Sequence, residues 1–291
     1  MTPDTNPIRT AIYLSLLMVL ISSVSVATTR YASDYTSTAA IVTLQYLVCC
    51  VLCIPRTVRH GLAPLATQRL PLHLFRGVVG VLGFYLFYAS VQHIALVDAM
   101  LLRQSAPLTL PLVMWAWNRE RVPWRSLIPL VIGFMGIAVI LRPSPEGLSW
   151  WHAAGVASAF TLSISMVATG ELARTEPASR ILFYYFFLSL VCVAPFSLGD
   201  FSGLPWQVWL AMLFIGVSMY FALGLYTRAY ALAPAWAIAP VNYLAVVLTG
   251  VWGWLIWGQV PDTWTLLGSA LVIGGGLFTI ALGRRIDRSS G

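Results

Sequence analysis

Ten apolar runs recur along this 291-residue chain, each close to the length of a helix that crosses a lipid bilayer. Such a helix needs about 20 residues to cross roughly 30 Å of hydrocarbon. Only 9% of the residues are charged, against about 25% in soluble domains. The chain is therefore predicted to be an all-α integral membrane protein with ten transmembrane helices. The predicted spans are residues 11–27, 36–54, 73–92, 96–117, 126–141, 150–169, 180–198, 206–230, 235–257 and 263–283.

The two halves of the chain repeat each other without a gap at an offset of 138 residues. The segment from Tyr88 to Gly136 carries the same landmarks, in the same order, as the segment from Tyr226 to Gly274. A unit of five spans enters the membrane upside down in its second copy, and inverted-topology repeats are characteristic of solute transporters. The predicted domains are a first five-helix repeat over 1–143, a linker over 144–149, a second inverted repeat over 150–283 and a cytoplasmic tail over 284–291.

Positive charge indicates how the chain is oriented. All seventeen basic residues are arginines and the net charge is +7. If both termini are cytoplasmic, fourteen arginines lie on the cytoplasmic side, and only Arg30 and Arg142 lie outside, as the positive-inside rule requires. The charge thus needs no nucleic-acid partner. The first run ends like a secretory signal. Its residues 26–28 recur as residues 167–169 in the sixth run, which makes the first run the repeat partner of a membrane span. We therefore expect it to remain uncleaved. The predicted location is a bacterial inner membrane, with the lipid bilayer as partner.

Several classes of function lack support in the sequence. No intramembrane enzyme motif is present: there is no His-Glu-x-x-His, no Gly-x-Ser-x-Gly and no pair of intramembrane aspartates. No residue set predicts a metal or a cofactor. Except for residues 55–72, the connections between spans are short, which leaves no room for a soluble catalytic domain. The glycine clusters favour close helix packing within one chain, so a monomer suffices. Function is expected among the helices.

Short motifs at the ends of the spans resemble those of a known family. They are residues 74–77 (LFRG), 119–123 (RERVP), 226–231 (YTRAYA) and 258–261 (GQVP). Together they resemble the EamA-type drug/metabolite transporters, and within them the amino-acid exporters, the aromatic amino-acid exporter included. The resemblance covers nearly the whole chain and implies two five-helix inverted repeats around a central cavity. Gln259 departs from the glutamate common in this family, which argues against a charge-based role there.

Arg103 stands out because an arginine at a helix centre costs about 2.5–3.5 kcal/mol on insertion scales. It shares one polar, proline-containing face of the fourth span with four neighbours. The prolines free backbone carbonyls, which lipid cannot satisfy but a water-filled cavity can. We therefore expect this face to line a central cavity. The residues on the face are Met100, Arg103, Gln104, Pro107 and Pro111.

The guanidinium of Arg103 offers a planar two-donor fork that suits a substrate carboxylate. Two alternatives stay open. Arg103 could extend to the outer membrane interface, or it could pair with Asp98 for structural reasons. Its repeat counterpart is Val241, so the polar end of a substrate is expected on the first repeat's side of the cavity.

Further candidate substrate-binding residues are mainly aromatic. In the third span, Phe84, Tyr85 and Tyr88 lie opposite a glycine-rich face and could stack on an aromatic substrate or attract an ammonium group; tyrosines could equally form an interfacial belt. In the ninth span, Trp236, Pro240 and Tyr243 share one side of the helix. Asn242, the repeat counterpart of Gln104, lies on a different side, so the two indications of which side faces the cavity conflict. All four residues are kept as candidates. Ser22, Ser25 and Ser163 could also line the cavity or bond their own backbone.

The predicted function is alternating-access export of amino acids and related metabolites, with aromatic or large neutral amino acids favoured. No acidic residue lies in the middle of an apolar run, whereas a proton relay would need one, so transport is expected to be facilitative. The alternatives are multidrug efflux of lipophilic compounds, possibly proton-coupled, and a channel. Arg103 argues against lipophilic cations as substrates because it would repel them.

Overall fold

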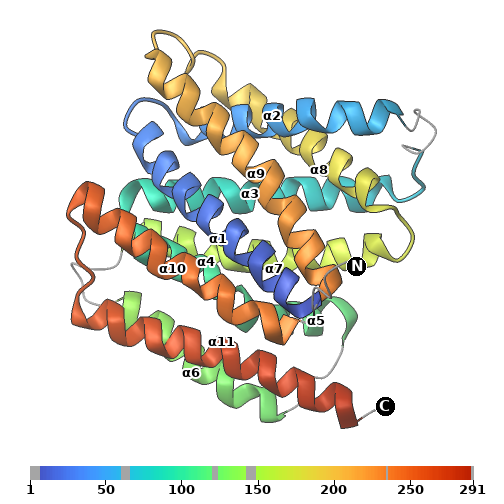
Figure 1. Ribbon diagram of the computed structural model, residues 1–291, viewed down its shortest axis with the longest axis vertical. Coiled ribbons are helices and arrows are strands. Elements are labelled where there is room, and N and C mark those ends of the chain that lie inside the picture. Colours follow the sequence, from blue (N-terminus) through green and yellow to red (C-terminus); the bar gives the residue numbers. More distant parts are fainter. Residues whose placement is uncertain (1–6, 60–65, 120–123, 142–148, 234, 290–291) are drawn as a thin grey trace, which may run out of the picture.

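A computed structural model describes residues 7–59, 66–119, 124–141, 149–233 and 235–289 of the chain. Within these ranges the regular elements are helices, and no strand is present (Figure 1). The helices are α1 (Pro7–Ala32), α2 (Thr38–Arg59), α3 (Leu70–His93), α4 (Leu96–Gln104), α5 (Ala106–Asn118), α6 (Trp124–Leu141), α7 (Trp150–Ala173), α8 (Ala178–Val193), the 3₁₀ helix η2 (Ala194–Ser197), α9 (Trp206–Leu232), α10 (Ala235–Trp257) and α11 (Thr263–Ser289).

Among the described residues, five helical segments are long and apolar enough to cross a membrane. They are α1, α3, α7, α8 with η2, and α9. Shorter apolar stretches lie in α2, α10 and α11, over Thr38–Ile54, Val241–Trp257 and Thr263–Phe278. The chain is thus an all-helical protein with several membrane-spanning helices. The arrangement of ten spans as two inverted repeats stays a prediction.

The predicted fourth span is two helices rather than one. The nine-residue α4 ends at Gln104, and α5 begins at Ala106, with Ser105 between them. Pro107 is the physical reason, because its ring nitrogen has no hydrogen to donate to the carbonyl of Arg103 and its ring clashes with that carbonyl. The Ser105 hydroxyl donates to the Leu102 carbonyl at 2.5 Å, which satisfies one carbonyl at the broken end. The break leaves Arg103 in the last turn of α4.

Two other predicted spans end in ways that hydropathy alone does not indicate. Helix α8 gives way to the 3₁₀ helix η2, which has Pro195 at its start, where a missing backbone N–H is tolerated. Helix α11 continues through residues 284–289, the segment predicted to be a tail. No proline interrupts α11 there, and its last turns carry arginines, which favour a helix C-terminus. Nearly all of the predicted linker lies outside the described residues.

The two halves of the chain pack on each other along their lengths. Helix α6 lies along α11, α1 along α9, and α3 along α7 (Figure 1). Exchanging the two halves converts the α1–α9 contact into the α7–α3 contact, since α1 corresponds to α7 and α3 to α9. Glycines permit the closest approaches: Gly136 of α6 lies against the backbone of α11 near Gly268. The core is therefore built between the repeats rather than within each one.

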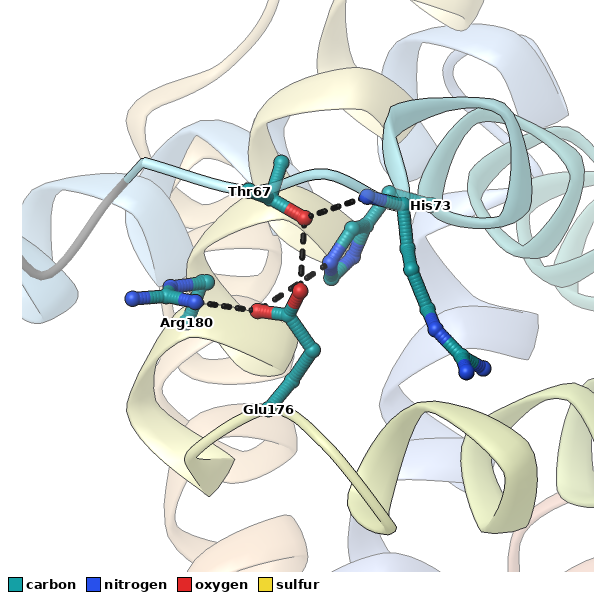
Figure 2. A network of polar contacts seen from close by, with 5 residues as sticks. Thr67, His73, Glu176 and Arg180 are labelled. Atoms are coloured by element: carbon teal, nitrogen blue, oxygen red, sulfur yellow. Dashed lines mark hydrogen bonds and ion pairs between the residues drawn. The ribbon is translucent and has the colours of Figure 1, made fainter.

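A polar network joins the loops α2–α3 and α7–α8 at one end of the bundle (Figure 2). The Glu176 carboxylate accepts hydrogen bonds from the Thr67 hydroxyl and the Arg180 guanidinium, both at 2.6 Å. The imidazole of His73 lies 3.9 Å from the same carboxylate. The Glu176 side chain is only 4% exposed, so its charge depends on these donors.

At the other end of the bundle, a second acidic residue joins the loops α1–α2 and α8–α9. The Ser37 hydroxyl donates to the Asp200 carboxylate at 2.5 Å, and the Thr36 hydroxyl donates to the Asp200 backbone carbonyl at 3.0 Å. Under the duplication, these two loops correspond to the loops that Glu176 joins. In this conformation, polar contacts centred on an acidic residue therefore tie both ends of the bundle.

We expect Glu176→Gln to lower the apparent Tm at pH 7, because a hydrogen bond to a charged group contributes about 1.5–3 kcal/mol. Burial raises the pKa of the Glu176 carboxyl, but the hydrogen bonds from Thr67 and Arg180 and the charge of Arg180 outweigh it and hold the pKa below its ordinary value of 4.5. A lowered pKa means that the stabilisation is present at neutral pH and is lost as pH falls through the lowered pKa. Thermal unfolding in detergent from pH 7 to pH 3 measures it.

The matched control is Glu171→Gln. Glu171 pairs with Arg174, whose side chain is 71% exposed, and surface pairs of this kind contribute little. The control variant should keep the parent Tm across the pH series. Equal Tm values for parent and Glu176→Gln at pH 7 would contradict the stabilising role of the network.

Candidate functional site

A cavity of about 220 Å³ lies among five helices drawn from both halves of the chain. Its walls combine apolar side chains, neutral polar groups and a single arginine. The lining residues are Met18, Val19, Ser22, Ser25 and Val26 of α1; Phe84, Phe87 and Tyr88 of α3; Met100, Arg103 and Gln104 of α4; Ser218, Met219, Ala222 and Tyr226 of α9; and Asn242 and Ala245 of α10. A concave, mostly apolar site with a few polar groups is typical of small-molecule binding.

Two phenylalanine rings hold the Arg103 side chain in the cavity wall. The guanidinium carbon lies 4.5 Å from the ring centroid of Phe84 and 4.6 Å from that of Phe87. One Nη donates to the backbone carbonyl of Gly83 at 3.2 Å. Arg103 also lies in the last turn of α4, where the helix dipole favours a cation. Cation–π attraction and this dipole together offset part of the cost of burying the charge.

The two structural alternatives for Arg103 find no support in its contacts. With 8% of its surface exposed, the residue is buried rather than extended to an interface. The Asp98 carboxylate accepts a hydrogen bond from Thr265 of α11 at 3.2 Å. In the part of the chain that the structure describes, no carboxylate lies within ion-pair distance of Arg103. The guanidinium carries five N–H donors, so it keeps donors for a bound anion.

Two polar pairs of repeat counterparts line the cavity, beside the apolar pair Phe84 and Ala222. Tyr88 and Tyr226 form one pair, and Gln104 and Asn242 form the other. The Gln104 side-chain amide donates to the Asn242 backbone carbonyl at 3.0 Å, which joins α4 to α10. The Tyr88 hydroxyl donates to the Gln45 side-chain oxygen at 2.5 Å. The duplication thus places polar side chains on both sides of the cavity, while Arg103 is contributed by the first half alone.

Eight of the predicted binding residues line this cavity: Ser22, Ser25, Phe84, Tyr88, Met100, Arg103, Gln104 and Asn242. Sequence reasoning missed several others. Tyr226 had a signal, because it is the counterpart of Tyr88. Phe87 had no signal beyond being aromatic, and the apolar or small residues of α1, α9 and α10 resemble those of any packed helix. The missed lining residues are Met18, Val19, Val26, Phe87, Ser218, Met219, Ala222, Tyr226 and Ala245.

Five predicted residues lie elsewhere. Pro111 lies inside α5 and is not among the lining residues. Tyr85 is 41% exposed, because one residue along α3 turns the side chain about 100° from Phe84. Pro107 acts through the backbone, since it breaks the span below Arg103. Ser163 is buried and bonds the Thr109 hydroxyl at 2.7 Å and the Ala106 carbonyl at 2.9 Å, so it packs α7 against α5. Tyr243 lies against α11 at Gly276.

The ninth predicted span presented two conflicting faces, and the structure brings Asn242 to the cavity while Tyr243 points to α11. The side chains of Trp236 and Pro240 lie outside the described part of the chain.

Formal charge in the cavity is carried by Arg103, and no acidic residue is among the lining residues. An isolated cation in a low-dielectric site favours an anionic group on a ligand and repels a second cation. The aromatic rings of Phe84, Phe87 and Tyr88 offer apolar contact beside it. The site can therefore hold a ligand that combines a carboxylate with an apolar or aromatic body.

Comparison with known proteins identifies the family. The EamA-like transporter family model matches the chain twice, over residues 9–142 and 149–281. A pseudopaline exporter, CntI, from Pseudomonas aeruginosa is 28% identical over 268 residues, covering 91% of this chain and 94% of the relative. A riboflavin transporter from Brucella anthropi is 24% identical, covering 88% of this chain and 93% of the relative. An S-adenosylmethionine uptake transporter from Rickettsia bellii is 25% identical, covering 91% of each chain.

A solved crystal structure shares the fold, with a TM-score of 0.61, 17% sequence identity and coverage of 94% of this chain and 98% of that one. The relatives are membrane transporters of small metabolites, in agreement with the predicted resemblance. The two matches of the family model together cover most of the chain, and the protein belongs to the EamA-like transporter family.

Proposed function

We propose that the protein exports amino acids, with aromatic or large neutral ones favoured, by alternating access across a bacterial inner membrane with both termini cytoplasmic. The observation that carries the proposal is the Arg103 guanidinium, which is buried in an aromatic cavity wall and has no carboxylate partner among the described residues. A buried cation held without a counter-ion is costly unless a ligand supplies the anion. The carboxylate of an amino acid supplies it.

The rest of the cavity suits the remainder of such a substrate. Phe84, Phe87, Tyr88 and Met100 give a large apolar and aromatic surface next to Arg103, and aromatic side chains stack on rings of this kind. The relatives carry small metabolites, in one case outward and in another inward. Export is the direction that the resemblance to amino-acid exporters favours.

The proposed mechanism is facilitative. A proton-coupled transporter needs a titratable carboxylate at the substrate site or on the path to it, and the lining residues include none. Glu176 is held by hydrogen bonds that favour its ionised form at neutral pH, so it is a poor proton carrier in that range. The substrate gradient alone would then drive net movement.

Uptake into proteoliposomes tests the proposal directly. The purified protein is given labelled phenylalanine, labelled leucine and a lipophilic cation, each with and without a pH gradient. We expect phenylalanine and leucine flux in the absence of a gradient and little cation flux. Cation flux without amino-acid flux would reject the substrate class in favour of multidrug efflux. Amino-acid flux that requires the pH gradient would reject the facilitative mechanism and keep the substrate class.

A further inference from the structure

Asn242 is held by a side-chain contact with α9 and a backbone contact with α4. Its amide nitrogen donates to the Tyr230 hydroxyl at 3.1 Å. The hydroxyl groups of Tyr230 and Tyr226 hydrogen bond to each other, and their rings lie 4.3 Å apart. The Asn242 backbone carbonyl accepts from Gln104. The Tyr230 contact uses one of the two N–H donors of the amide nitrogen, and the amide oxygen of Asn242 is left as an acceptor.

That amide oxygen is buried and has no hydrogen-bond partner among the described residues. Several other buried polar atoms share this property, but in the described part of the chain Asn242 Oδ1 is the one that belongs to a residue lining the cavity. An unpaired buried acceptor costs free energy because it has lost its water without gaining a donor. A ligand donor that reaches this atom would remove the cost.

We propose that Asn242 Oδ1 accepts a hydrogen bond from the substrate ammonium group while Arg103 binds the carboxylate. This inference rests on the proposed function. The two residues come from opposite halves of the chain, and the Gln104–Asn242 hydrogen bond joins their helices next to Arg103. An α-amino acid carries its anion and its cation on one carbon, so it can bridge a donor and an acceptor across the cavity. The site then selects amino acids over carboxylates that lack the amino group.

The choice of a neutral acceptor follows from the charge of the cavity. A carboxylate in place of the Asn242 amide would pair with Arg103 in the empty site and compete with the substrate. An amide oxygen does not neutralise the guanidinium, yet it still accepts from an ammonium group, and such charge-assisted bonds are the strong ones. Arg103 therefore stays available for the substrate carboxylate.

The test compares phenylalanine with 3-phenylpropionate, which keeps the ring and the carboxylate but lacks the amino group. Both labelled compounds are measured in proteoliposomes with the parent protein and with Asn242→Leu, which removes the amide at similar size. We expect Asn242→Leu to raise the KM for phenylalanine by about 10- to 100-fold, since hydrogen bonds to charged groups are of that strength. The KM for 3-phenylpropionate should stay unchanged.

A second variant, Asn242→Asp, separates recognition from folding. Its carboxylate competes for Arg103, so we expect weaker transport of both compounds. It also keeps an acceptor at the same position, so it should retain more selectivity for phenylalanine over 3-phenylpropionate than Asn242→Leu does. Equal losses for both compounds in Asn242→Leu, or no loss for either, would overturn the assignment of Asn242. Arg103→Gln should weaken transport of both compounds alike. If the parent protein carries neither compound, the proposed function itself fails. If the parent carries phenylalanine and Asn242→Leu does not change its selectivity, only the role of Asn242 fails.

Discussion

Replacing Arg103 by glutamine is expected to reduce phenylalanine uptake into proteoliposomes by about 10- to 100-fold, because charged hydrogen bonds contribute about 1.5–3 kcal/mol. The guanidinium carries the formal charge in the cavity wall, and no acidic residue among the lining residues competes for it. Glutamine keeps a polar group of similar reach but cannot attract a carboxylate by charge. Initial rates over a range of phenylalanine concentrations measure the change.

Two further variants make this result specific. Arg103→Lys keeps the charge but loses the planar fork and its contacts with Phe84 and Phe87, so we expect an intermediate rate. Arg174→Gln removes an arginine whose side chain is 71% exposed and should leave uptake at the parent level. Parent-level uptake by a folded Arg103→Gln protein would rule out carboxylate binding by this residue.

Replacing Gly136 by alanine is expected to destabilise the protein by about 1–3 kcal/mol, the usual cost of overpacking. A Cβ at Gly136 would lie 2.8 Å from the Gly268 carbonyl oxygen, the Leu271 Cβ and the Val272 backbone nitrogen. Backbone atoms cannot move aside as a flexible side chain can, so α6 and α11 must separate. Because this is one of the long contacts between the two halves, the apparent Tm should fall by several degrees.

The duplication supplies the matched control. Gly274 is the repeat counterpart of Gly136, and a Cβ there would meet no atom within 4 Å. Alanine is favoured over glycine in helices by about 1 kcal/mol at either position, so the difference between the two variants isolates packing. Gly274→Ala should keep or raise the parent Tm. Equal Tm values for the two variants would show that the α6–α11 contact is looser than described.

The break at Ser105 shows how far local sequence reasoning reaches. Pro107 and Pro111 predicted freed carbonyls in the fourth span, and the structure places the break directly after α4, next to Arg103. In the same way, α10 occupies residues 235–257, the range that its apolar run predicts. Boundaries set by hydropathy or by proline chemistry are local properties, so the sequence carries them. The contacts of Ser163 with α5 are not local, and nothing near Ser163 in the chain signals them.

The sequence by itself determined that the chain is a duplicated helical membrane protein of the EamA type, and that the charge of Arg103 needs a reason. Tertiary structure decided which sides of the helices meet: Phe87 rather than Tyr85 lies at the cavity, and Asn242 lines it while Tyr243 packs on α11. The physical reason is that a membrane helix is apolar all round. With no contrast between a buried and a wetted side, periodicity cannot distinguish a cavity wall from a packing surface, and only the neighbouring helices do.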